Sequence, residues 1–180
     1  VIAGFIIMVA FIAEQAAEAW SALHLERTMG AGAAMGALGP TILGVTMGIG
    51  RLYGQVMTER FGEMKTIRVS AVFASFGAVL AGASINLGLT YAGFAILGLG
   101  ISVMVPLIFA VVGKSVPARK RTLIISRVAL VGYIGFFVGP AMMGGVSQVF
   151  TLGTSFVILG VVLGLVGGLM PPLLTRYSHS

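Results

Sequence analysis

Long apolar runs separated by short charged segments constrain the fold of this chain more than any other feature. Segment 50–65, GRLYGQVMTERFGEMK, carries five charged side chains and lies between two such runs. Charged groups are costly in hydrocarbon. We therefore expect this segment to mark the point where one membrane crossing ends and the next begins.

Composition supports a chain that crosses the membrane several times. Hydrophobic residues make up 58% of the sequence and charged residues 9%, whereas soluble domains carry roughly 25% charge. A soluble helical protein with a large core is the alternative, and so little charge argues against it.

The net charge is +6, but the basic residues gather in the short segments, as is usual in membrane proteins. We therefore do not expect a nucleic-acid partner; membrane lipid is the expected surrounding.

Six apolar runs are long enough to cross a bilayer, which takes about 20 residues. The sequence predicts an all-α membrane protein with a single domain over 1–180. The expected spans are 1–23, 33–53, 66–85, 89–112, 123–145 and 155–174, and the expected polar loops include 24–28, 55–65 and 113–122. The chain opens inside an apolar run without an initiator Met, and we interpret it as part of a longer protein.

The distribution of basic residues predicts the orientation. Two connections and the tail hold most of the cations, whereas the opposite connections hold Arg27; the first group comprises Arg51, Arg60, Lys65, Arg68, Lys114, Arg119, Lys120, Arg121 and Arg176. Lys and Arg concentrate in cytoplasmic loops. We therefore expect both chain ends in the cytoplasm and a multi-pass location in a bacterial inner membrane.

Glu14 and Glu18 are the acidic residues within an expected span. They are four residues apart and share one helix face, and Gln15 and Trp20 lie beside them. Carboxylates inside the membrane suggest a functional site, here a path for protons or substrate. The alternative places Glu18 at the headgroups and bonds Glu14 to a neighbouring helix. Arg127 lies near a helix end, where it can snorkel to the interface.

A second candidate site is a cytoplasmic latch, in which ion pairs hold one conformation and break in another. Its expected members are Arg51, Gly54, Glu59, Arg60 and Gly62. The alternative is a solvated loop whose charges only set topology. Pro106 and Pro140 each remove a backbone hydrogen bond and should bend their helices.

Several chemistries have no support in the sequence. There are no cysteines, and imidazole comes only from His24 and His179, which we expect in a loop and in the tail. We therefore predict no metal site and no cofactor. No phosphate-binding loop and no nucleophile–base pair is present, so we do not expect an enzyme.

Three motifs resemble one half of a transporter of the major facilitator superfamily (MFS), in particular the bacterial YbjJ-like branch. They are EQAAEAWSAL from Glu14, GRLYG from Gly50 followed by RFG from Arg60, and YIGFFVGP from Tyr133 followed by Gly144 and Gly145. The resemblance covers nearly the whole chain. It departs from the family at Gln55, where an aspartate is usual, so that Glu59 would have to supply the acid of the latch.

The resemblance implies the C-terminal six-helix bundle of a twelve-helix carrier, built from two inverted three-helix repeats. It implies a bend motif at Gly135, Gly139 and Pro140, and a central cavity beside Glu14 and Glu18. The expected function is secondary transport of a small solute by alternating access, coupled to protons, with the missing N-terminal half or a second copy as partner. The alternative is a non-transporting membrane module or a proteolytic half that forms a homodimer. The substrate and the direction of transport stay open.

Overall fold

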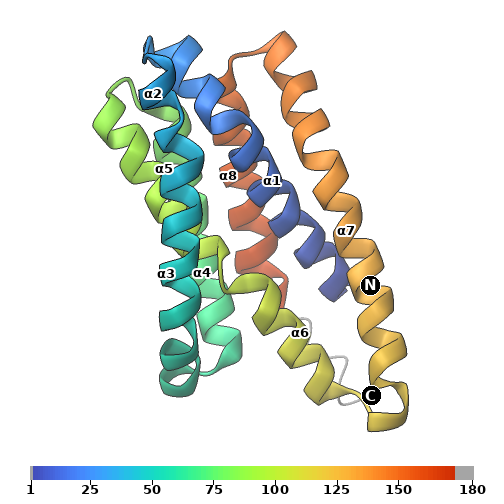
Figure 1. The fold of residues 1–180 in the computed structure, drawn as a ribbon. Coiled ribbons are helices and arrows are strands. Elements are labelled where there is room, and N and C mark those ends of the chain that lie inside the picture. The colour runs from blue at the N-terminus through green and yellow to red at the C-terminus, as the bar shows by residue number, and fades with distance from the viewer. Residues whose placement is uncertain (1, 173–180) are drawn as a thin grey trace.

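The computed structural model describes residues 2–172, and these residues form helices joined by short connections (Figure 1). Val1 and residues 173–180 lie outside the described part, including Arg176, His179 and the expected end of the last span. The elements are α1 (Ile2–Met29), α2 (Ala33–Gly36), α3 (Leu38–Phe61), α4 (Glu63–Ala83), α5 (Leu87–Ile101), α6 (Met104–Ser115), α7 (Ala118–Val149) and α8 (Leu152–Leu169).

Six helical segments are long and apolar enough to cross a membrane, which confirms the predicted number of spans. Four are single helices, and the other two are the pairs α2–α3 and α5–α6. The break between α5 and α6 falls at Ser102 and Val103. Pro106 has no N–H to donate to the Ser102 carbonyl, so the predicted bend occurs one turn before the proline. Around Pro140, by contrast, α7 continues as one helix.

The charged segments expected as loops are largely helical, so the loops predicted over 55–65 and 113–122 are far too long. Helix α3 continues past Tyr53 to Phe61, and α4 begins directly after Gly62, which has φ +81°. Between α6 and α7 only Val116 and Pro117 are not helical. Arg, Lys and Glu are good helix formers, so charge ends the apolar part of a span without ending the helix.

The first three spans and the last three make equivalent contacts: if α1, α3 and α4 are replaced by α5, α7 and α8, and the reverse, the pattern of packing stays the same. Helix α1 packs on α7 as α5 packs on α3, and α1 contacts α8 as α5 contacts α4. Helices α4 and α8 pack on each other and complete the bundle. This is the pattern that two inverted three-helix repeats give. In Figure 1, α1 lies between α3 and α7.

Glycines bring the backbones of α1 and α7 together. A Cβ atom on Gly135 would overlap the Met8 carbonyl, and one on Gly139 would lie 2.8 Å from the Ile12 carbonyl oxygen. Small residues that allow close approach are the usual contact between membrane helices, because lipid is as apolar as the side chains. The glycines of the expected bend motif therefore serve the contact between α1 and α7.

His24 lies inside the bundle, so the expectation of a polar turn over 24–28 is wrong. Helix α1 continues to Met29, and Gly30 with φ +67° follows it. The His24 side chain is fully buried, and its ring lies 5.3 Å from that of Phe156. Its Nε2 lies 3.1 Å from the carbonyl of Ala81, to which it donates. That carbonyl is among the last four of α4, which have no partner within the helix.

Replacing Gly135 by alanine should lower the melting temperature of the protein. The added methyl group meets the Met8 backbone, which cannot move aside, and overpacking of this kind destabilises by about 1–3 kcal/mol. Gly145→Ala is the matched control on the same helix, because no atom lies within 4 Å of a Cβ there. Thermal unfolding in detergent measures both. Equal melting temperatures for the two variants would contradict the proposed contact.

His24→Ala should also destabilise the bundle, by about 2–5 kcal/mol, because it leaves a cavity between aromatic rings and an unpaired carbonyl at the end of α4. Thr28→Ala, at an exposed position of the same helix, should stay within about 0.5 kcal/mol of the parent. The same unfolding measurement compares them. A shift for His24→Ala as small as that of the control would show that the ring is not part of the core.

Candidate functional site

One face of α1 carries polar side chains in the middle of the membrane span. Glu14 and Gln15 are half-buried and Glu18 is exposed, whereas Ala13, Ala16 and Ala17 on the opposite face are buried in the core. Gln15 Nε2 lies 3.5 Å from Glu18 Oε2, which is at the limit of a hydrogen bond. The predicted pair Glu14–Glu18 thus lies on a face that the described bundle leaves partly open.

Arg51 lies near this face. It was predicted at the end of a span, but α3 continues to Phe61. Ten further residues of helix follow it, or about 15 Å at 1.5 Å per residue. Arg51 is exposed and forms no ion pair with Glu14 among residues 2–172. Its charge nevertheless acts on the Glu14 carboxyl group, as does the charge of Glu18.

Aromatic side chains continue the open face from α1 to α7. The ring of Phe11, one turn before Glu14, stacks on Tyr133 with centroids 5.3 Å apart. It also meets Phe136 edge-on at 6.3 Å. Tyr133 itself is 53% exposed. The face therefore combines two acids, one arginine and an aromatic wall.

Trp20 has a different environment from the two acids. Its indole Nε1 donates a hydrogen bond of 3.0 Å to the Pro140 carbonyl, and its ring lies over Gly144, where a Cβ would come within 3.0 Å. These contacts fasten α1 to α7. A buried or half-buried indole usually finds such an acceptor, so its place is explained by packing.

At the α3–α4 end of the bundle, the charged residues of the predicted latch form contacts within α3, whereas Gly54 packs against Val103. Gln55 Nε2 donates to Glu59 Oε1 at 3.0 Å. The Arg60 guanidinium lies 5.6 Å from the centroid of the Phe61 ring. Gly54 is buried, and a Cβ there would overlap Val103. Gly62 supplies the positive φ of the turn.

An ion pair that was not predicted connects α4 to α6. Lys114 Nζ lies 2.6 Å from Glu63 Oε1, and this contact is the single ion pair within residues 2–172. Gly62 could have indicated it, since a glycine with positive φ ends one helix and places Glu63 in the first turn of the next. The pair joins the first three spans to the last three at this end.

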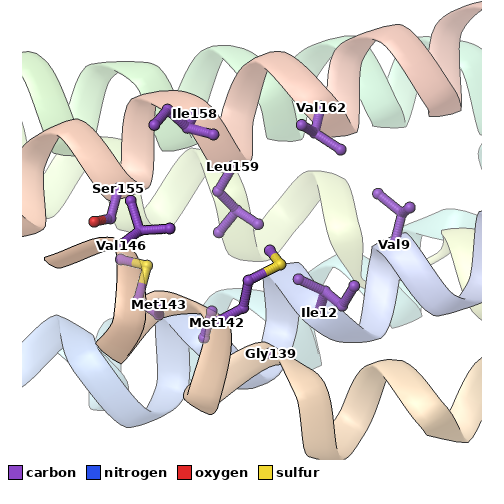
Figure 2. Close-up of a pocket in the computed structure, with 11 residues that line it drawn as sticks. Val9, Ile12, Gly139, Met142, Met143, Val146, Ser155, Ile158, Leu159 and Val162 are labelled. Atoms are coloured by element: carbon purple, nitrogen blue, oxygen red, sulfur yellow. The ribbon is translucent and has the colours of Figure 1, made fainter. Parts of the chain in front are cut away.

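A partly open apolar cavity of about 50 Å³ lies among α1, α7 and α8 (Figure 2). Ser155 lies at one end of it, and Val9 and Val162 lie at the other. The Ser155 hydroxyl already donates to the Thr151 carbonyl at 3.0 Å. This cavity is separate from the polar face and too small for a solute. Within the described part of the chain, no three His, Cys, Asp or Glu side chains gather as metal ligands would.

Comparison with known proteins places the chain in a family. The sequence model of the Major Facilitator Superfamily matches residues 2–179. An uncharacterised MFS-type transporter of Yersinia pestis is 27% identical over 89% of this chain and 41% of its own length. The uncharacterised transporter y4wD of Sinorhizobium fredii is 31% identical, with 94% and 45% covered. The membrane protein MosC of Rhizobium meliloti is 30% identical, with 87% and 38% covered.

The chain thus spans less than half the length of the curated relatives that it matches. A match over nearly the whole chain, together with six apolar helices arranged in two groups of three, leads to one conclusion. The chain belongs to the major facilitator superfamily and forms a multi-pass membrane domain of a transporter family.

Proposed function

We propose that the chain is one half of a secondary active transporter, which moves a small solute by alternating access and couples it to protons. The observation that carries this proposal is the half-buried carboxyl group of Glu14 in the middle of α1, on a face that the described bundle leaves partly open. Ionisable groups inside a membrane are rare and mark ion or substrate paths.

The proposed coupling uses the charge state of Glu14. When its carboxylate is ionised, it attracts Arg51 and so favours the present approach of α1 and α3. When a proton neutralises it, that attraction is lost, and the arginine becomes available to an anionic group of the solute. A carboxylate near Arg and a second acid can exchange protons in this way because its environment differs between the two arrangements.

The proposed carrier needs a second half. The polar face of α1 is partly open, and the relatives are more than twice as long as the matched region. The missing N-terminal half, or a second copy related by a two-fold axis, would close the solute path. We also place the latch at the α3–α4 end, where Glu63–Lys114 would form and break with Glu59, Arg60 and Gly62 beside it.

Proton flux tests the proposed role of Glu14. Full-length protein in lightly buffered proteoliposomes receives a panel of solutes while the external pH is recorded. We expect Glu14→Gln to abolish solute-dependent proton movement, because the amide cannot release a proton. Glu18→Gln should cause a smaller loss, since Glu18 is exposed.

The control for that measurement is Glu26→Gln, which removes a carboxylate near the far end of the same helix and should leave the flux intact. Flux that persists in Glu14→Gln would refute the coupling role. Absence of flux with every solute for the parent protein would favour a non-transporting module instead.

Labelling of single cysteines tests the proposed orientation, with both ends in the cytoplasm of a bacterial inner membrane. Gly62→Cys and Arg119→Cys, in a cysteine-free full-length protein, should react with a membrane-impermeant maleimide only after the cells are opened. Ile85→Cys, at a position 99% exposed on the α4–α5 connection, should react in intact cells. The reverse pattern would contradict the orientation that the basic residues predict.

A further inference from the structure

We propose that a groove between α4 and α8, at the α3–α4 end of the bundle, binds one anionic phospholipid. The groove has a volume of about 730 Å³, carries the cations Lys65 and Arg68, and has an apolar wall formed by Val69, Val72 and Phe73. This site lies away from the polar face of α1, and its argument does not depend on transport.

The groove lies beside the close contact of α4 with the last turn of α8. In the middle of the contact, Ser75 donates a hydrogen bond of 2.7 Å to the Gly160 carbonyl. A Cβ on Gly167 would overlap Ala71, but one on the next residue, Gly168, would be 4.0 Å from its nearest neighbour, Val72. Gly167 therefore lies in the contact with α4, whereas Gly168 points to another side of α8 and leaves room for the groove beside Val72.

The two cations are held at the edge of the groove. Arg68 Nε donates to the Gly168 carbonyl at 3.2 Å, which uses one of the five N–H donors of a guanidinium. Lys65 Nζ lies 5.3 Å from the centroid of the Phe61 ring. Within residues 2–172, Glu63 forms an ion pair with Lys114, and no carboxylate in this range forms an ion pair with Lys65 or Arg68. Both basic groups can meet one phosphate.

The depth of the cations matches the headgroup layer. Helix α4 has 21 residues, or about 31 Å at 1.5 Å per residue, which is close to the thickness of the hydrocarbon core. Lys65 and Arg68 lie in its first two turns and so reach the interface. Val72 and Phe73 follow about one turn deeper, where an acyl chain would lie.

A second apolar hollow of about 260 Å³ lies on the other side of Lys65, with Phe61 and Val69 in its lining. Lys65 thus stands between two hollows, with Arg68 beside the larger one, as the phosphate of a phospholipid stands above two acyl chains. Among residues 2–172, no acidic residue lines either hollow, so the ammonium group of a zwitterionic lipid would find no partner there. Basic pockets between membrane helices are typical sites for anionic headgroups.

Lipid titration of the full-length protein tests this site. Native mass spectrometry in detergent measures binding of phosphatidylglycerol, of phosphatidylcholine with the same acyl chains, and of glycerol 3-phosphate. We expect retention of phosphatidylglycerol alone. In Lys65→Gln/Arg68→Gln its affinity should fall about thirtyfold, since each basic residue near an anionic surface contributes roughly a factor of five.

Two further variants separate the parts of the site. Lys120→Gln/Arg121→Gln removes the same charge from the α6–α7 end and should leave the affinity unchanged. Gly168→Leu keeps both cations and fills the groove, where a side chain has room, and should weaken binding at least tenfold. Melting temperatures without added lipid confirm that each variant is folded.

Three results would overturn the proposal. If the Lys120→Gln/Arg121→Gln control lost as much affinity for phosphatidylglycerol, the effect would come from the overall charge of that end of the bundle and not from this groove. If phosphatidylcholine bound as tightly as phosphatidylglycerol, the two cations would have no role in selecting the lipid. Binding of glycerol 3-phosphate as tight as that of phosphatidylglycerol would assign the cations to a soluble phosphate and leave the apolar wall without a function.

Discussion

Close approach of helix backbones at glycine is the contact on which the rest of this structure depends. The hydrophobic effect does not drive helices together in lipid, so packing and close backbone contact must do so. Gly135 meets α1, Gly77 and Gly93 bring α4 and α5 together, and Gly160 meets α4 beside Ser75. These contacts tie the first three spans to the last three, and the polar groups are positioned by them.

The polar face of α1 is possible because the opposite face carries the packing. Ala13, Ala16 and Ala17 are buried almost completely, and small side chains let α1 sit deep among its neighbours. Glu14 can then stay half-buried, within reach of the charge of Arg51 from α3. Had α1 been surrounded on all sides, an ionisable group in its middle would have cost several kcal/mol without a partner.

The two ends of the bundle differ in how they are held. At the α4–α5 end, His24 fills the space between aromatic rings and satisfies the last turn of α4. At the other end, a groove opens beside Gly168, and a partly exposed ion pair from Glu63 to Lys114 connects the two groups of spans.

Hydropathy predicted the six spans, and the missing N–H of Pro106 predicted the bend near it. Both predictions were possible because the cost of charge in hydrocarbon and the lack of a proline N–H act locally along the chain. The same reasoning misjudged segment 50–65, since charge says where the membrane ends and does not say where a helix ends. Arg51 was consequently predicted at the end of a helical span, whereas α3 continues beyond it to Phe61. His24 was likewise read as part of a turn because polar neighbours follow it.

The sequence by itself determined the class of this protein: an all-helical membrane domain of the major facilitator superfamily, with basic connections on one side. Composition and spacing are sufficient for the six spans and the basic connections, because each span is decided by its own residues, and the three motifs carry the resemblance to the family. Only the tertiary structure decided that Arg51 lies near Glu14, that Glu63 pairs with Lys114, and that a groove opens beside Arg68. Those contacts join residues 37, 51 and 100 positions apart, so they depend on how the helices pack.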